Sequence, residues 1–421
     1  NDYTIISSEQ SGFGNLAQNY FVLNNNDICC IELVNGKTKI KTNTLYSLKN
    51  VNQTNIQVLP DEFKHWTRKE IYEQSDSALR AISLGGRLLC NNKVKLGGLN
   101  QCKDLLVEID NIILLGCGTS YFAGLLGKEY FKDLCEFNTV QIFDGAEFKE
   151  NDIPKIGKTA LILLSQSGET KDLHRCISIG KKNNLLLVGV VNIVDSLIAR
   201  EVDCGVYLNA GREVGVASTK SFTSQVIVLC LISIWFSQHK KLNFMKRKKY
   251  IDDLRGLYIN IQNTLNYCED QIDELVNLFN HNSCFILGKG KCEAIAKEGA
   301  LKIKEISYIH AEGYSTSSLK HGPFALLYPE FPVILLAPDD DNYSKAENAY
   351  EEIKSRHANI IFISDKLNHY DYKNYIKIDK NDSFKDLLCI IPIQLLAYKL
   401  SLNKGLNPDM PRNLAKVVTV E

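Results

Sequence analysis

The sequence has no long apolar run and no excess of either charge. Its longest apolar stretch, 226–236, already contains Ser233, whereas a membrane-spanning helix needs about 20 apolar residues. Lys and Arg number 49, as do Asp and Glu, so the net charge is zero. This balance argues against nucleic acid and anionic membranes as partners, and the start at Asn1 is not a basic signal region. We therefore expect a cytoplasmic protein in which 226–236 is a core helix.

The sequence also lacks the spacings that mark metal and dinucleotide sites. Its 13 cysteines include no C-x-x-C pair, and its 8 histidines form no H-x-x-x-H set, so we expect reduced, buried thiols and no metal. Gly116 and Gly118 follow an apolar run, but Tyr121 stands where a dinucleotide fingerprint needs its third glycine. No cofactor is predicted.

What the sequence does contain is an internal repeat with an offset of 172 residues. The apolar run that ends at Gly116 recurs at Gly288, and the runs that begin at Leu161 and Leu187 recur at Val333 and Asn359. Such runs alternate with amphipathic stretches, which predicts βαβ units whose parallel strands are buried on both faces. We therefore predict an α/β fold of two tandem, doubly wound domains, each with a parallel sheet flanked by helices.

Hydroxyl groups follow two predicted strands of the first half. Ser165, Ser167 and Thr170 come directly after one apolar run, and Thr119 and Ser120 follow another. Open parallel sheets bind ligands at the carboxyl ends of their strands, and the N–H groups at a helix start favour phosphate, although such hydroxyls also serve as helix caps. The matching place in the second half reads Ala-Pro-Asp. We therefore predict phosphate binding in the first half only.

Titratable residues gather in the second half instead. Glu298, Lys302 and Glu305 share one face of a predicted helix, and this stripe is either a solvated salt-bridge face or the lining of a cleft. His321 lies in a Gly-Pro turn and is either a group that titrates near neutrality or an ordinary surface histidine. Lys416 precedes an apolar end segment, where burial would lower its pKa and make it a nucleophile toward a carbonyl, unless the segment is a flexible tail.

Together these motifs resemble one family, the glucosamine-6-phosphate synthases, which are glutamine–fructose-6-phosphate aminotransferases (isomerizing). The likeness lies in the isomerase part, covers about residues 63–421, and rests on the motifs at 115–120, 165–170, 213–222, 298–312, 319–323 and 411–421, with 65–74 resembling the stretch ahead of that part. It implies two tandem sugar isomerase (SIS) domains and a remnant of an N-terminal glutaminase domain. The expected boundaries are 1–60 for the remnant and linker, 61–240 and 241–402 for the SIS domains, and 403–421 for a tail.

The resemblance also implies roles for individual residues. It gives Glu305 the proton transfer between C1 and C2 of the sugar, with Lys302 assisting, and it gives Lys416 a Schiff base with the open-chain ketose. It has His321 promote ring opening from the neighbouring subunit. The implied catalytic set is Glu298, Lys302, Glu305, His321, Arg412 and Lys416. The implied substrate-binding set is Cys117, Gly118, Thr119, Ser120, Ser165, Gln166, Ser167, Thr170, Val216, Ser218 and Ala415.

The implied activity is conversion of fructose 6-phosphate to glucosamine 6-phosphate, the first step of hexosamine (UDP-GlcNAc) biosynthesis. The implied assembly is a homodimer or higher homo-oligomer, and glutamine or ammonia is the nitrogen donor of the full-length protein. Two alternatives stay open. A glutaminase-free SIS deaminase or isomerase should lack the Arg-Asn-Leu-Ala-Lys motif at 412–416, and a non-catalytic sugar-phosphate sensor need not keep the acid–base residues.

The sequence departs from the family pattern in two places. Ser317 and Ser318 stand where the family usually has Gly-Glu. The chain starts at Asn1 without the family's N-terminal nucleophilic cysteine, and residues 1–50, with a strand pattern at 28–33, resemble the closing segment of the glutaminase domain. We expect either an excerpt of a longer polypeptide or a protein that has lost glutamine hydrolysis.

Overall fold

The computed structural model of the chain describes residues 4–7, 10–13, 16–23, 27–50, 59–367 and 372–416, and its contacts divide the chain into two units, Asn1–Glu62 and Phe63–Glu421. The first unit contains η1 (Gln10–Phe13), β1 (Asn19–Tyr20), β2 (Cys29–Val34), β3 (Lys37–Thr42) and β4 (Lys49–Asn50). Strand β1 pairs with β4, and β2 pairs with β3, both antiparallel. Strand β2 confirms the strand expected at 28–33.

The first half of the second unit is built on a five-stranded parallel sheet. Its strands are β7 (Asn111–Gly116), β8 (Thr139–Asp144), β9 (Thr159–Ser165), β10 (Leu186–Val191) and β11 (Cys204–Tyr207), in the spatial order β11-β10-β9-β7-β8. Its helices are η3 (Glu150–Asp152), α5 (Thr119–Leu134), α6 (Lys171–Lys182), α7 (Leu197–Glu201) and α8 (Lys220–His239). Strands β7 and β9 are buried at every position, as a sheet covered by helices on both faces requires.

The second half repeats this sheet with the same strand order. Its strands are β12 (Ser283–Gly288), β13 (His310–Ser315), β14 (Pro332–Leu336), β15 (Asn359–Ser364) and β16 (Tyr375–Lys377), in the order β13-β12-β14-β15-β16. Its helices are α10 (Lys291–Ser307), η5 (Thr316–His321), η6 (Pro323–Leu326), α11 (Tyr343–Lys354), α12 (Lys385–Leu388) and α13 (Ile390–Asn403). The bounds of β12 and α11 are those of β7 and α6 plus 172. The structure confirms the predicted repeat and the fold of two tandem, doubly wound domains.

Further elements precede the first sheet and connect the two halves. Ahead of the sheet lie α1 (Trp66–Tyr72), α2 (Gln74–Ala81), η2 (Ser83–Gly85), β5 (Leu88–Cys90), β6 (Lys93–Val94), α3 (Gly97–Asn100) and α4 (Lys103–Leu106). The halves are connected by α9 (Phe244–Leu275) and η4 (Val276–Leu278). Helix α9 packs against α2, α8 and α13, so the connection is itself part of the core.

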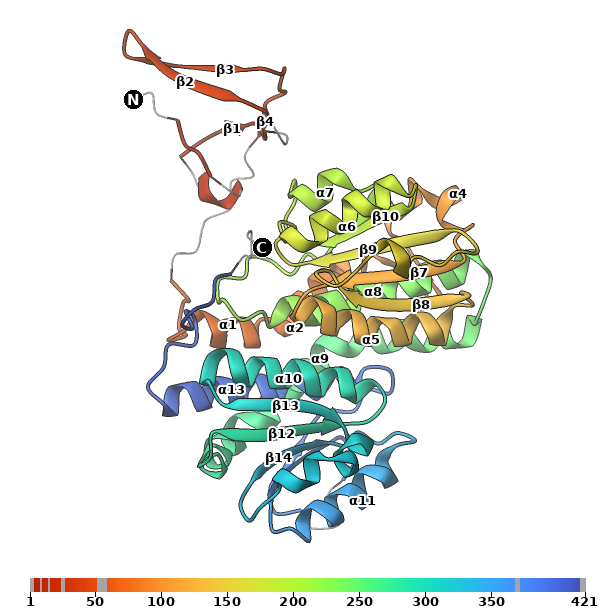
Figure 1. Cartoon of the computed structure of the whole chain (residues 1–421), viewed down its shortest axis with the longest axis vertical. Helices are drawn as coiled ribbons and strands as arrows, with labels where there is room; N and C mark the ends of the chain where they lie inside the picture. The colour runs from red at the N-terminus through yellow and green to blue at the C-terminus, as the bar shows by residue number, and fades with distance from the viewer. Residues whose placement is uncertain are drawn as a thin grey trace. The chain divides into compact units, whose positions relative to one another are not determined.

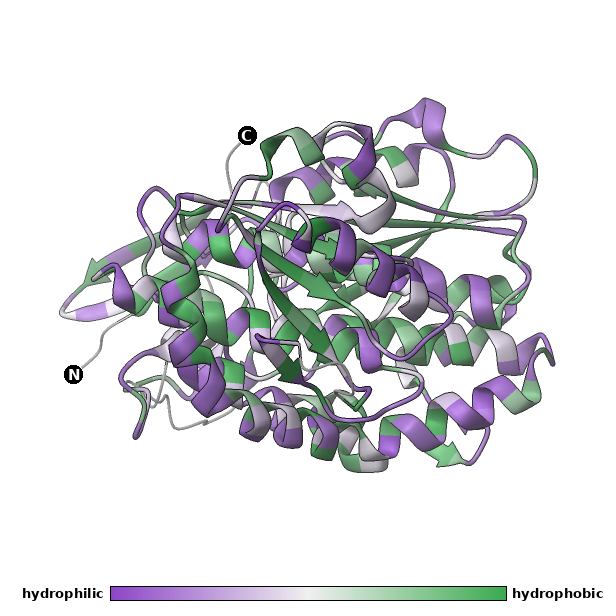
Figure 2. Cartoon of the chain, turned by 90° about the horizontal axis from the view of Figure 1, so that it is seen from below, coloured by the Kyte–Doolittle hydropathy of each residue, from purple (hydrophilic) through white to green (hydrophobic). Residues whose placement is uncertain are grey.

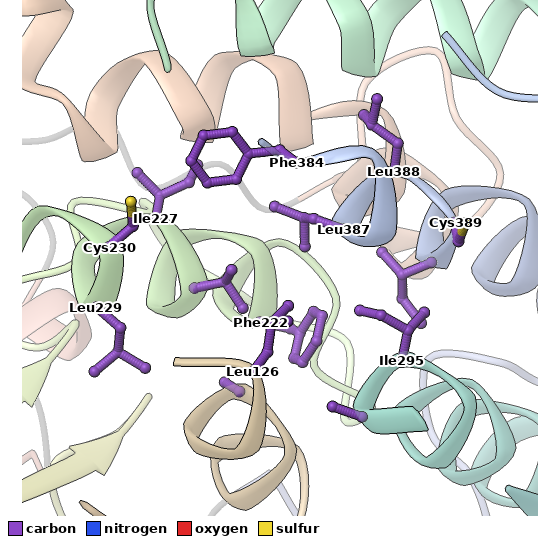
Figure 3. Packing of buried hydrophobic residues seen from close by; sticks show 14 of the residues in the cluster. Leu126, Phe222, Ile227, Leu229, Cys230, Ile295, Phe384, Leu387, Leu388 and Cys389 are labelled. Atoms are coloured by element: carbon purple, nitrogen blue, oxygen red, sulfur yellow. The ribbon is translucent and has the colours of Figure 1, made fainter. Parts of the chain in front are cut away.

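Helices from both halves form a layer between the two sheets (Figure 1). Helix α5 packs on α8 and on β7 and β8, α10 packs on α13 and on β12 and β13, and α5 and α10 contact each other. Buried apolar residues of both halves, among them Phe222, Ile295 and Phe384, belong to one continuous core (Figure 3). Because the halves share this core, residues of the second half can reach a site at the edge of the first sheet.

Helix α8 is the core helix that the apolar run at 226–236 predicts, and its residues from Lys220 to Ser237 are buried. By length and composition alone, α8 and the segment Lys385–Asn403 could cross a membrane, but 94% and 83% of their most apolar windows are buried inside the protein. Figure 2 shows the same pattern: hydrophobic residues dominate the strands at the centre, and polar residues mark the outer helices. Both segments therefore serve as core helices in this fold.

Candidate active site

The loop between β9 and α6 carries hydroxyl groups that the sequence predicts for phosphate binding. Ser165 Oγ lies 2.9 Å from Thr170 Oγ1 and 3.5 Å from Ser167 Oγ, and it accepts a hydrogen bond from the backbone N–H of Gly168. Gly168 has a φ of 70°, and a Cβ there would lie 2.0 Å from Ser196 Oγ, so the turn requires glycine. Thr170 is the N-cap residue of α6 but makes no side-chain capping bond. The alternative interpretation, that the hydroxyl only caps the helix, therefore does not hold for Thr170.

The turn between β7 and α5 lies beside this loop, because β7 and β9 are neighbours in the sheet. Gly118, with a φ of 54°, precedes the helix, and Thr119 and Ser120 occupy its first turn. Gln225 of α8 donates a hydrogen bond to Ser120 Oγ at 2.9 Å. Burial, with help from a nearby carboxylate, raises the pKa of the Cys117 thiol to about 12, so Cys117 is a neutral lining group. Two strand ends thus bring the predicted hydroxyls to one edge of the sheet.

Glu298, Lys302 and Glu305 lie on one face of α10, as their spacing predicts. Lys302 Nζ is 2.6 Å from Glu305 Oε2 and 3.4 Å from Glu298 Oε1. The Glu298 and Lys302 side chains are 0% and 1% exposed, whereas that of Glu305 is 21% exposed. The stripe is therefore a buried charged cluster from which Glu305 reaches solvent, and it is not a solvated salt-bridge face.

Lys302 joins this cluster to the first half of the unit. Its Nζ donates a hydrogen bond to Thr119 Oγ1 at 2.9 Å, and Thr119 Oγ1 donates one to Glu298 Oε1 at 3.2 Å. One cation here serves two carboxylates. Burial, the largest cause, raises the pKa of Glu298 to about 8, although Lys302 acts in the opposite direction. Glu298 is therefore mostly protonated near neutral pH, which leaves the Lys302 charge to Glu305.

Lys416 lies beside the loop that follows β11. Its Nζ is 2.7 Å from Glu213 Oε2, 2.7 Å from the carbonyl oxygen of Gly215 and 3.5 Å from Ser218 Oγ. The sequence favours apolar surroundings for this amine, but the structure pairs it with a buried carboxylate. The nucleophilic amine therefore requires this ion pair to open. The apolar residues after Lys416 lie outside the described residues.

The chain around Lys416 is held by contacts on both sides. The backbone N–H of Val216 donates a hydrogen bond to the carbonyl oxygen of Asp409 at 3.1 Å. The backbone N–H of Arg412 donates one to the Tyr308 hydroxyl at 2.7 Å, and the Arg412 guanidinium carbon lies 4.3 Å from the centroid of that ring. Ala415 is exposed. Arg412 thus anchors the tail to the end of α10 and does not contact the lysine directly.

His321 does not join these groups within the chain. It ends η5 and is exposed, and its side chain makes no hydrogen bond or ion pair with any residue that the structure describes. Its predicted role from a neighbouring subunit stays a prediction. Near the departure from the family pattern, Ser317 accepts a hydrogen bond from Lys289, and Lys320 pairs with Glu352 at 2.6 Å. Two lysine contacts therefore hold this segment.

Sequence reasoning missed two buried carboxylates in this region. Glu213 holds Lys416, and Glu70 of α1 accepts hydrogen bonds from the backbone N–H groups of Val214 and Gly215. Both carboxylates lie in stretches that carry the family resemblance, at 65–74 and 213–222. Those stretches are far apart in the chain, so no spacing in the sequence indicates that they meet.

The fold and the site define a class of protein. Two parallel sheets of identical strand order, with hydroxyl-rich strand ends in the first, are accompanied by a match of the SIS domain profile to residues 105–234 and 277–400. The chain is therefore a protein with two SIS domains.

Similarity to known proteins narrows this class. The C-terminal domain of glucosamine-fructose-6-phosphate aminotransferase from Francisella tularensis has a TM-score of 0.78 and 30% identity, covering 84% of this chain and 100% of that one. A probable glutamine–fructose-6-phosphate aminotransferase (isomerizing) of Acanthamoeba polyphaga mimivirus is 46% identical over 100% of this chain and 69% of its own length. A Schizosaccharomyces pombe relative of the same name is 38% identical over 86% and 52%. The chain belongs to the family of glutamine–fructose-6-phosphate aminotransferases (isomerizing) and spans 52–69% of the length of these two relatives.

Proposed function

We propose that this chain carries the isomerase chemistry of its family and converts fructose 6-phosphate toward glucosamine 6-phosphate. The observation that carries the proposal is the 2.9 Å hydrogen bond from Lys302 to Thr119. It joins the acid–base residues of the second half to the hydroxyl-bearing strand ends of the first. A substrate whose phosphate lies on those hydroxyls has its sugar carbons within reach of a carboxylate.

Substrate binding follows from the loops at the edge of the first sheet. The hydroxyls of Ser165, Ser167 and Thr170, with those of Thr119 and Ser120, donate hydrogen bonds to the phosphate oxygens. The start of α6 adds the positive end of its helix dipole. We assign Gln166, Val216, Ser218 and Ala415 to the part of the substrate between its phosphate and Lys416.

The reaction uses one amine and one carboxylate. The Lys416 amine attacks the C2 ketone of the open-chain sugar, and loss of water leaves a Schiff base. Ammonia then displaces the lysine from C2 and leaves the sugar ketimine, which frees the Lys416 amine; without ammonia, water releases the open-chain ketose instead. Glu305 removes a proton from C1 and returns it to C2 while the C1 hydroxyl loses its proton and becomes the aldehyde, which turns the ketimine into the 2-amino aldose, or the ketose into the aldose. Lys302 steadies the negative charge that develops on the sugar oxygen, and Glu298 positions Lys302. His321 of a second copy promotes ring opening, and this role implies a homodimer or higher oligomer.

The wider setting is part of the proposal. Glutamine or ammonia supplies nitrogen in the full-length protein, and the product enters hexosamine biosynthesis in the cytoplasm. Residues 1–60 belong to a glutaminase-type domain in this proposal, and the SIS domains by themselves isomerise fructose 6-phosphate or use external ammonia.

The test is an assay of the purified chain with fructose 6-phosphate. We expect aldose phosphate to form, and borohydride to trap a covalent sugar phosphate on the protein, detected by mass spectrometry. Lys416→Ala should lose the adduct, whereas Lys404→Ala, a change at an exposed lysine of the same tail, should keep it. No aldose phosphate from the unmodified chain would contradict the enzyme and favour a non-catalytic sugar-phosphate sensor.

A further inference from the structure

Glu213 connects the proposed Schiff-base lysine to the start of α8. Its side chain is 0% exposed. It accepts hydrogen bonds from the backbone N–H groups of Thr219 at 3.0 Å and Ser221 at 3.2 Å, and from Ser221 Oγ at 3.0 Å. Its remaining partner is Lys416 Nζ at 2.7 Å. The carboxylate is therefore fixed by three donors of one helix start, independently of its ion pair with the lysine.

We propose that Glu213 is the positioning residue of Lys416: its buried carboxylate pairs with the amine and fixes the position of the nitrogen before the sugar enters. This inference rests on the proposed function, because it assumes that Lys416 reacts with the substrate. The carbonyl oxygen of Gly215 accepts the second hydrogen bond of the amine at 2.7 Å. Two fixed acceptors thus define the direction of the Lys416 nitrogen next to Ser218.

The charges around Glu213 support this role. Glu70 faces it from α1, Lys220 faces it from α8 and pairs with Glu73, and Lys416 faces it from the tail. Burial acts to raise the pKa of Glu213, but the charge and hydrogen bond of Lys416 dominate with their neighbours and hold it at about 2. Burial and the charge of Glu213 raise the pKa of Glu70 to about 8. Of the two carboxyls, Glu213 is the ionised one at neutral pH.

Glu70 also fixes the loop that presents the second acceptor. It accepts hydrogen bonds from the N–H groups of Val214 and Gly215, and the Gly215 carbonyl in turn accepts from Lys416. The influence of Glu213 extends to the acid–base cluster, since its charge is one of those that raise the pKa of Lys302 against the effect of burial. Glu213 therefore acts on the reaction through two lysines and not by contact with the sugar.

The test measures borohydride trapping of fructose 6-phosphate on the protein as a function of pH. Glu213→Gln keeps the shape and two hydrogen bonds but removes the charge. We expect the midpoint of its trapping curve to lie at least about one pH unit below that of the unmodified chain, because the ammonium loses its counter-ion. The maximal trapping rate should fall at least about tenfold, because the amine is no longer held in place.

Two further variants separate positioning from a structural effect. Glu213→Asp keeps the charge on a shorter side chain, so its midpoint should stay near that of the unmodified chain while its rate falls several-fold. Glu73→Gln removes a nearby, partly exposed carboxylate that pairs with Lys220 and not with Lys416, so both parameters should remain unchanged.

The possible outcomes are distinct. If the unmodified chain forms no adduct at any pH, the proposed function fails. If it forms the adduct but Glu213→Gln has the same midpoint, or Glu73→Gln shifts it equally, the positioning role is wrong. If Glu213→Gln does not fold, Glu213→Asp decides, because an unchanged trapping rate in that variant overturns the inference.

Discussion

The two halves of the second unit share one fold but use its matching positions differently. At the offset of 172 residues, the charged triad of α10 corresponds to Leu126, Tyr130 and Asp133 of α5. Leu126 and Tyr130 are fully buried in the core, and Asp133 pairs with Lys246 near the surface. The same helix therefore packs in one half and carries acid–base groups in the other.

The crossing of α5 and α10 shows the same division. Lys302 of α10 meets Thr119 at the start of α5. At the offset of 172 residues, Lys291 at the start of α10 corresponds to Thr119, and Tyr130 of α5 corresponds to Lys302. These two residues also meet, and the Lys291 Nζ lies 5.0 Å from the centroid of the Tyr130 ring. The arrangement is approximately twofold, but one of these two crossings joins acid, base and hydroxyl, and the other is a packing contact.

At the strand ends, the first half carries the groups proposed to bind substrate, and the second half does not. The loop after β9 presents hydroxyls, whereas the loop after β14 presents three consecutive aspartates at 339–341. There the backbone N–H of Asp339 donates to Asp365 at 2.7 Å, so a carboxylate takes an N–H group that a phosphate would need. The two copies of the fold therefore contribute different groups to one site. The first half supplies hydroxyls at its strand ends, and the second half supplies acid–base residues on α10.

The largest expected effect separates the two matching acids. Glu305→Gln should lower kcat for isomerisation by about 10²–10⁴-fold, because an amide cannot accept the proton from C1, and KM should change little. Asp133→Asn, at the matching position of α5, should leave kcat near its original value. Steady-state kinetics with fructose 6-phosphate measures both, and equal losses would break the comparison.

The next effect concerns stability at the two crossings. Lys302→Met leaves the partly buried Glu305 carboxylate without its cation and the Thr119 and Glu298 oxygens without their buried donor, and should lower the free energy of unfolding by about 3–5 kcal/mol. Tyr130→Phe should change it by less than about 1 kcal/mol, because the Tyr130 hydroxyl is buried without a hydrogen-bond partner among the described residues and the ring facing Lys291 remains. Urea unfolding measures the difference, and similar values would show that the crossings contribute alike.

The pH dependence of stability distinguishes Glu298 from its apolar counterpart Leu126. The pKa of Glu298 rises from 4.5 in a model peptide to about 8 in the folded chain, so the native state binds this proton more tightly than the unfolded state. Its contribution is full below about pH 4.5, falls as pH rises, and is lost above about pH 8. Between pH 5 and 8 the unmodified chain should lose roughly 2–4 kcal/mol more than Glu298→Gln. Urea unfolding at several pH values measures this, and parallel curves would contradict the assignment.

The smallest effect tests the strand ends. Ser167→Ala should raise KM for fructose 6-phosphate about tenfold through one lost hydrogen bond to phosphate. Asp339→Ala, in the matching loop of the second half, should leave KM unchanged. Initial rates over a range of substrate concentrations measure KM for both variants. A rise in KM for Asp339→Ala would contradict the prediction that only the first half binds phosphate.

Much of the fold and part of the site could be predicted from local patterns. Continuous apolar runs identified the strands, since each run is buried on both faces, and the i, i+4, i+7 spacing placed Glu298, Lys302 and Glu305 on one helix face. The surroundings of Lys416 could not be predicted, because its neighbour Glu213 precedes it by 203 residues. The burial of Glu298 and Lys302 could not be predicted either, since the same spacing occurs on solvated helices.

The sequence by itself determined the repeat, the strand and helix pattern and the family, because hydrophobic periodicity and motif residues are properties of short segments. Only the tertiary structure decided which groups meet. Lys302 reaches Thr119 across 183 residues of chain, and Lys416 reaches Glu213. Ion pairing and burial depend on how distant segments pack, and packing decides which carboxyls keep their protons.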